Sequence, residues 1–254
     1  MWSRFFSAKA SSGGTIAGDR PQANFGPHIA ADCAAPPATL DEINRCEGRL
    51  GSLLPAALRQ FLTSRCNGGT FAGGLFHVLG AARPLRHDDL ATWNQPRDWK
   101  SAFHGFGLDR YVFFADDIFG NQFGYLPGDA DPAVQRFDIQ MGEWLAVSPS
   151  LARFLEQQVS EEGAWLLGAD FLQAYRDGGH AMEAGLQLSM VIPGLLGGSM
   201  EPENLRPIDP ATNLYVAGQV VTRIKPLPPG TEVRGFRVDD SSRSVTFETR
   251  APRY

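Results

Sequence analysis

The sequence predicts an α+β fold in which an antiparallel sheet is flanked by helices. Two segments with the 3–4 spacing of buried helical faces come first, over residues 39–51 and 55–67. Segments rich in aromatic and β-branched residues follow at hairpin spacing as far as residue 147, and another helix comes after them. Helices and strands that are segregated along the chain in this way are typical of an α+β domain.

The first two helices carry explicit start and stop signals. Thr39 and Glu42 have the spacing of a capping box, and Gly51 is expected to end the first helix. Pro55 stands where a first-turn proline is tolerated. Asn67-Gly68-Gly69 is expected to end the second helix, because these residues accept the left-handed conformation of a helix C-terminus.

The sheet is expected to be a meander of short strands. The expected strands cover residues 71–79, 111–115, 122–126, 134–139 and 143–147. Gly120-Asn121 and Met141-Gly142 stand at two tight turns between them, which favours antiparallel pairing. Ser148 is predicted to cap the next helix, with Pro149 in its first position.

The sequence divides into three regions. Residues 1–37 are rich in Gly, Ser and Pro signals and are expected to be a flexible N-terminal tail. Residues 38–160 hold the predicted α+β domain. Residues 161–254 are a C-terminal α+β extension, expected to contain short helices and a β-hairpin over 233–249. Whether that hairpin extends the main sheet or packs alone is left open by the sequence.

The composition favours a globular protein that binds another protein. Hydrophobic residues make up 43% of the 254 residues and charged residues 20%, which is ordinary for a folded domain. The net charge of −5 disfavours nucleic-acid binding and suits a basic partner. The three cysteines form no C-x-x-C pair, which is typical of free thiols in a reducing compartment.

The sequence gives no sign of a membrane partner. It lacks a run of about 20 apolar residues, which a membrane span needs. The N-terminus lacks the apolar core of a signal peptide. We therefore expect a cytoplasmic protein. Its oligomeric state is not indicated.

Three motifs, taken together in their order along the chain, resemble those of a known family. The first is LGSLLP at residues 50–55, which runs into LRQFL at 58–62 and NGG at 67–69. The second is FADDIFGNQFGY at 114–125, and the third is EWLAVS at 143–148, before a helix with Phe154-Leu155. Together they resemble the SUKH superfamily, which includes the yeast cell-wall assembly regulator family and many bacterial immunity proteins.

The resemblance implies a SUKH-like α+β fold and binding to another protein. We expect a bacterial immunity protein that neutralises a cognate toxin, one that is basic, by steric and electrostatic occlusion. The alternative is a regulatory or scaffold module with a non-toxin partner. The family brings no catalytic, cofactor-binding or metal-binding residue, so a non-enzymatic protein without cofactor or metal is expected.

Candidate partner-binding residues follow from turn and loop positions. Asp116 and Asp117 precede the turn at Gly120-Asn121, so one aspartate is expected to face outward while the other hydrogen-bonds the turn. Turn chemistry alone is the alternative for both. Trp93 and Trp99 lie in loop-like sequence and are expected either to anchor a partner or to pack under the loop. The full set is Asp116, Asp117, Asn121, Gln122, Trp93, Trp99 and Glu143.

The chemical alternatives are weaker. His87-Asp88-Asp89, with His77 ten residues before, is the nearest approach to a histidine–aspartate metal hydrolase, but these residues are expected in a strand and a solvated loop rather than on helices. Cys66 needs a positioned histidine to be a nucleophile, and the sequence places none beside it. The glycine-rich segment 67–74 lacks the lysine of a phosphate-binding loop.

Overall fold

The computed structural model describes residues 31–158, 169–180, 185–239 and 241–251. Most of the segment expected to be a flexible tail therefore lies outside the described residues. Its last part is not a tail, because Ala31–Ala34 form a strand, β1, whose backbone pairs with the main sheet.

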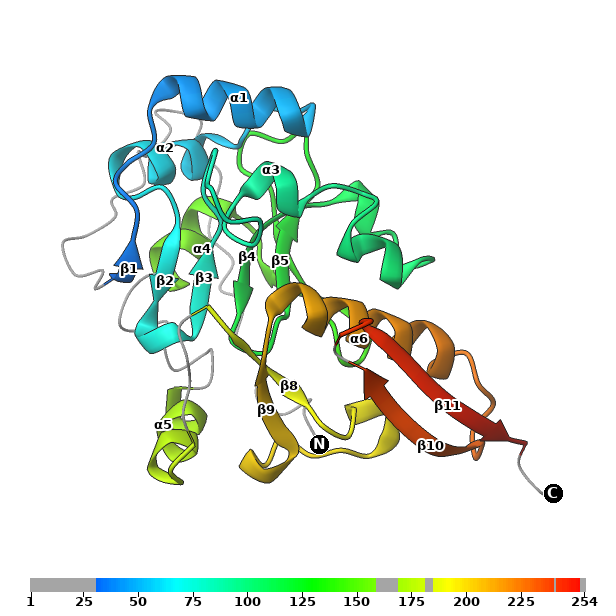
Figure 1. Ribbon diagram of the computed structural model, residues 1–254. Helices are drawn as coiled ribbons and strands as arrows, with labels where there is room; N and C mark the ends of the chain where they lie inside the picture. Colours follow the sequence, from blue (N-terminus) through cyan, green and yellow to red (C-terminus); the bar gives the residue numbers. More distant parts are fainter. Residues whose placement is uncertain (1–30, 159–168, 181–184, 240, 252–254) are drawn as a thin grey trace, which may run out of the picture.

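The main sheet has seven antiparallel strands, each paired with the next along the chain (Figure 1). They are β1, β2 (Gly69–Phe71), β3 (Phe76–Val78), β4 (Val112–Asp117), β5 (Gln122–Tyr125), β6 (Val134–Asp138) and β7 (Glu143–Ser148). The single strand expected over residues 71–79 is instead a hairpin. Ala72 and Gly74 adopt positive φ angles of 56° and 95°, which reverse the chain between β2 and β3.

The helices begin largely where the sequence predicts. They are α1 (Leu40–Leu50), α2 (Ala56–Ser64), α3 (Leu90–Trp93), α4 (Leu151–Gln158), α5 (Ala169–Asp177) and α6 (Pro210–Ile224). Both hydrogen bonds of the capping box between Thr39 and Glu42 are present, and Gly51 ends α1 in the left-handed conformation. The cap of α4 differs from the prediction: the Arg153 amide donates to the Ser150 hydroxyl rather than to Ser148.

Helices and loops cover both faces of the sheet. On one face, Phe154 of α4 packs edge-on against Phe76 and Phe114, with ring centroids 5.9 and 5.7 Å apart. On the other face, Trp99 is the first residue of a 3₁₀ helix (Trp99–Phe103), and its ring centroid lies 5.3 Å from that of Phe113 in β4. These buried rings join both layers into one hydrophobic core.

The C-terminal region completes this core. Leu214, Ala217 and Val221 of α6 are buried in the same cluster as the sheet residues, and α6 runs along the 3₁₀ helix Trp99–Phe103. Two strands that the sequence analysis missed, β8 (Gln187–Met190) and β9 (Leu205–Ile208), pair with each other. The predicted hairpin, β10 (Glu232–Asp239) and β11 (Ser244–Arg250), is a separate two-stranded sheet beside α6 (Figure 1). The hairpin therefore does not extend the main sheet. The division of the chain at residue 160 stays a proposal.

Across the described part of the chain, no helix combines the length and apolar character that a bilayer crossing requires.

Candidate functional site

Two neighbouring strands bring an imidazole and a carboxylate together. His77 of β3 is directly opposite Asp116 of β4 in the antiparallel register. Side chains at directly paired positions share one face of a sheet with their Cβ atoms about 5 Å apart. Gln122 of β5 is the next residue in this row, since it pairs with Asp116. The register therefore builds a polar row across the sheet.

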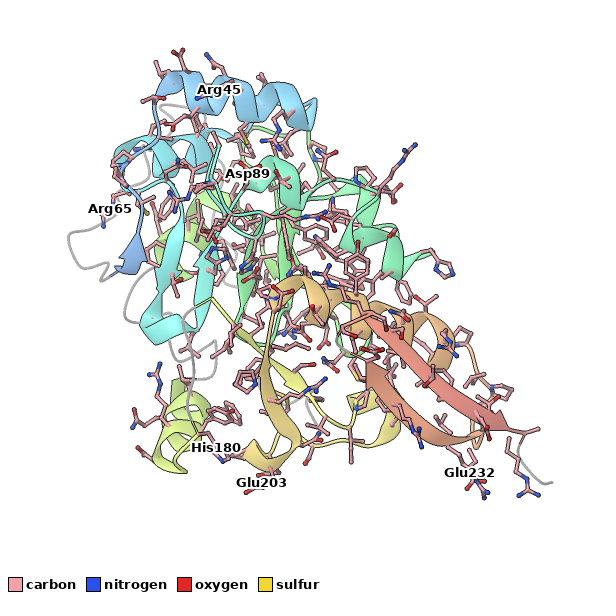
Figure 2. The ribbon with its side chains drawn as sticks, in the orientation of Figure 1. Arg45, Arg65, Asp89, His180, Glu203 and Glu232 are labelled. Carbon is pink, nitrogen blue, oxygen red and sulfur yellow. The ribbon has the colours of Figure 1, made fainter. Side chains whose placement is uncertain are left out.

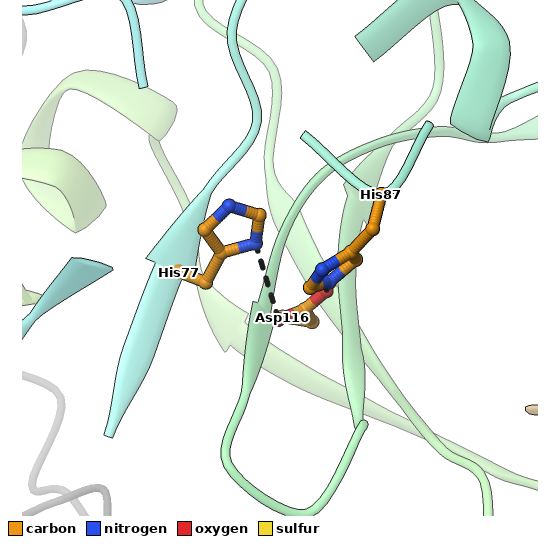
Figure 3. Close-up of side chains that lie close together, drawn as sticks. All are labelled: His77, His87 and Asp116. Carbon is orange, nitrogen blue, oxygen red and sulfur yellow. Dashed lines mark hydrogen bonds and ion pairs between the residues drawn. The ribbon is translucent and has the colours of Figure 1, made fainter. Parts of the chain in front are cut away.

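A loop adds a second histidine from above this row. His87 lies between β3 and α3, and its Nε2 is 2.8 Å from Asp116 Oδ2. His77 Nδ1 lies 3.5 Å from the other carboxylate oxygen, Oδ1, and His77 Nε2 lies 3.4 Å from Asp88 Oδ1. The two imidazole rings are 4.4 Å apart between centroids. Figure 3 shows both rings facing the Asp116 carboxylate, with His77 on β3 and His87 on the loop.

The loop is held in place by its own hydrogen bonds. The backbone amide of Gly80 donates to the Asp88 carbonyl, and the amide of Leu90 donates to the Gly80 carbonyl. Asp89 caps α3 by accepting from the Thr92 amide at 2.8 Å. These contacts fix the two ends of the loop, and the backbone of the loop thereby positions His87 above the sheet.

Charge pairing dominates the electrostatics of the cluster. Burial alone would lower the pKa of His77, but the Asp116 and Asp88 carboxylates outweigh burial and raise it to about 9. Burial opposes ionisation of Asp116 too, yet the two histidines hold the pKa of that carboxyl below its usual range. The hydrogen bond from His77 likewise lowers the pKa of Asp88. A protonated His77 between two carboxylates is thus one stable state of the cluster.

The same arrangement has the donor set of a metal site. One ligand atom from each of His77, His87 and Asp116 lies within 4.8 Å of the others. From the sequence, His77 is expected in a strand and His87 in a solvated loop, with no role for either. His77 is indeed in β3 and His87 in the loop after it, and the strand register and the loop path bring both side chains to Asp116. The expectation that the protein binds no metal stays a prediction.

The two tryptophans of the loop-like segment are buried. Trp93 and Trp99 have no exposed surface, and their indole nitrogens donate to Gln122 Oε1 and to the Trp93 carbonyl, each at 2.8 Å. Of the two alternatives for these residues, the structure shows packing beneath the loop. The expectation that they are exposed to a partner is wrong, because the loop folds back over the sheet face and takes both rings into the core.

The turn after β4 is covered rather than presented to solvent. Asp117 accepts hydrogen bonds from the Phe119 and Asn121 amides at 3.0 and 2.9 Å, so it carries the predicted turn chemistry. Its burial raises the pKa of its carboxyl to about 6. Asn213 of α6 donates to the Phe119 carbonyl at 3.2 Å. The C-terminal region thereby covers this turn.

The other candidate contacts divide between interior and surface. Asp116, Asp117, Asn121 and Gln122 are all buried, so neither aspartate faces outward as expected. Glu143 is exposed at the start of β7 and lies 3.4 Å from Lys225 Nζ. Of the seven candidates, Glu143 alone offers its side chain to a partner in this structure.

The comparisons with known proteins bear on the domain that holds this cluster. The profile of the SMI1/KNR4 family (SUKH-1) matches residues 37–157, just under half of the chain. Residues 37–157 belong to this family. The matched segment runs from the residues before α1 into α4 and contains His77, His87 and Asp116. The predictions of SUKH membership and of an α+β fold are confirmed.

Other comparisons add less. The crystal structure of Atu4351 from Agrobacterium tumefaciens is similar over 85% of this chain and 91% of its own, at 14% sequence identity and a TM-score of 0.47. The curated proteins contain no significant match to this chain.

Proposed function

We propose that this protein is a bacterial immunity protein, which binds a cognate protein toxin and neutralises it by occluding the toxin's active site. The observation that carries the proposal is the SUKH domain over residues 37–157, because the family is one of interaction and immunity modules. The motifs that identify the domain have structural roles: the corner between α1 and α2, the β4–β5 hairpin and the β7 strand. None of these roles requires catalysis.

The charge of the chain supports a basic partner. The net charge is −5, and a long-range attraction of this sign speeds the encounter with a basic protein. Charged side chains occur at widely separated places, such as Arg45 on α1, Glu203 beside β9 and Glu232 on β10 (Figure 2). Because these charges are spread over the surface, the electrostatic attraction between the chain and a basic partner raises mainly the association rate. Added salt screens this attraction and lowers the rate.

The outer face of α1 is a suitable contact surface. Leu40, Asn44 and Gly48 are spaced by four residues, so they share one exposed helix face, and Leu53 follows beyond Gly51. Leu40 is 64% exposed and Leu53 is 75% exposed. A shallow depression beside Leu53 is lined by Asn44, Glu47, Gly48, Gly51 and Ser52. The exposed residues Leu40, Asn44, Gly48 and Leu53 are called the α1 stripe below. Exposed apolar side chains next to a depression are favourable anchors for a partner.

The test is affinity purification of the tagged full-length chain from its native host, with the bound proteins identified by mass spectrometry. The proposal expects one toxin polypeptide in equimolar amount, whose association rate falls as salt rises. Leu53→Asp should weaken binding at least tenfold, whereas Leu126→Asp, at an exposed leucine outside the α1 stripe, should leave it unchanged. Recovery of regulatory proteins in place of a toxin would contradict the proposal and favour a scaffold module.

A further inference from the structure

We propose that His77, His87 and Asp116 bind a divalent transition-metal cation of the Zn²⁺ class. Two imidazoles and one carboxylate are a usual protein donor set for such ions. His87 Nε2 is 2.8 Å from Asp116 Oδ2, His77 Nδ1 is 3.5 Å from Asp116 Oδ1, and one ligand atom of each residue lies within 4.8 Å of the others. Tetrahedral Zn²⁺ with bonds of about 2.1 Å places its ligands about 3.3–3.5 Å apart.

The second ring nitrogen of His77 has the partner that a metal-bound histidine needs. Histidines that bind metals almost always donate their other N–H to a carboxylate or carbonyl. His77 Nε2 lies 3.4 Å from Asp88 Oδ1, which leaves Nδ1 to face Asp116 and His87. Nδ1 is buried and makes no aligned hydrogen bond. Nδ1 is 3.5 Å from Asp116 Oδ1 and faces the His87 ring, so it is placed to act as a ligand atom together with them.

The surroundings allow an ion to enter while holding the ligands firmly. His77 and Asp116 stand on paired central strands, and the Trp93 ring lies 4.9 Å from the His87 ring. The side chains of His77 and His87 keep 13% and 19% of their surface exposed, so the cluster is open to solvent on one side. Three protein ligands leave the fourth tetrahedral position to water or to a donor from a bound molecule.

Bound metal would join three separate segments of the SUKH domain. The ion would link β3 and β4 to the loop that carries His87, which also carries the exposed side chain of Leu85. Its main effect is therefore to fix this loop against the sheet. This role does not depend on the proposed function, since the ligands are all within the chain.

The experiment uses the full-length chain after treatment with a chelator and dialysis. Zn²⁺ is titrated by calorimetry, and Co²⁺ is added separately because its visible absorption reports tetrahedral coordination. We expect one Zn²⁺ per chain, and an unfolding midpoint that rises by about 5–10 °C at a hundredfold excess of free Zn²⁺ over its Kd. Co²⁺ should give intense visible bands, which Zn²⁺ abolishes.

Variants distinguish this site from adventitious binding. His87→Gln should remove the Zn²⁺-dependent rise in midpoint, and Asp88→Asn should weaken Zn²⁺ binding about 10–100-fold by removing the outer partner of His77. His104→Gln, at an exposed histidine outside the cluster, is the matched control and should bind like the parent. Equal Zn²⁺ affinity in His87→Gln and the parent would overturn the proposal. If His87→Gln fails to fold, the Co²⁺ spectrum of the parent is the test, and the absence of tetrahedral Co²⁺ bands would overturn the proposal.

Discussion

The contact between α6 and the 3₁₀ helix Trp99–Phe103 predicts that one helical glycine resists replacement. Gly218 lies inside α6, and a Cβ atom there would stand 2.6 Å from Ala102 Cβ and 2.8 Å from the Ala102 carbonyl carbon. In an open helix, alanine is more favourable than glycine by about 1 kcal/mol. Forcing atoms into a packed contact costs about 1–3 kcal/mol and more where backbone must move. Gly218→Ala should therefore lower the free energy of unfolding by about 1–2 kcal/mol.

Gly48→Ala is the matched control. Gly48 is also helical, in α1, but nothing lies within 4 Å of the position that its Cβ would take. Gly48→Ala should therefore raise the free energy of unfolding by about 0.5–1 kcal/mol. Both variants are compared with the parent by urea denaturation followed by circular dichroism. Equal stabilisation by the two substitutions would refute the packing of α6 against the SUKH domain.

Three further predictions concern the buried polar groups. Burial, only partly offset by Asp109, lowers the pKa of Lys100 from 10.5 to about 8, so between these pH values the unfolded chain holds a proton that the folded chain has lost. Between pH 8 and pH 10 the unfolding free energy of the parent should therefore rise relative to that of Lys100→Met. A difference between the two unfolding free energies that stays constant over this pH range, measured by denaturant titration, would contradict the prediction. Trp93→Phe should cost about 2–3 kcal/mol in urea titrations, because it leaves Gln122 Oε1 unpaired in the core; an exposed tryptophan would give no loss. Asn67→Ala should lower the free energy of unfolding by about 2–3 kcal/mol, because the Asn67 side-chain amide hydrogen-bonds both the N–H and the carbonyl of Ala81. Thermal melting measures this loss, and an unchanged melting temperature would count against it.

Features with local causes could be predicted from the sequence. The capping box of Thr39 and Glu42 acts across three residues, and the left-handed end at Gly51 depends on that residue alone. The aromatic strand at β4 and the turn after it were predicted for the same reason. The error at the α4 cap is small: Ser148 and Ser150 are both capping residues, and only the chain geometry decides that Ser150 accepts the bond.

Features that depend on distant segments could not be predicted. His77 and Asp116 are 39 positions apart and meet only because β3 and β4 pair in one register. The burial of Trp93 depends on the path of a polar loop, and the cover over the turn at Phe119 and Gly120 is supplied by Asn213 of the C-terminal region. A turn sequence that is typical of exposed hairpins is therefore compatible with an interior position when a later segment covers it.

A neutralisation assay with the co-purified partner decides whether this protein is an immunity protein. The partner gene is expressed in a sensitive bacterial host, alone or together with this chain, and growth is measured. The partner alone should arrest growth, and co-expression of the chain should restore it. Leu53→Asp should lose this protection, whereas Leu126→Asp should keep it. A partner that arrests growth equally with and without the chain, or that causes no arrest at all, would rule out an immunity function.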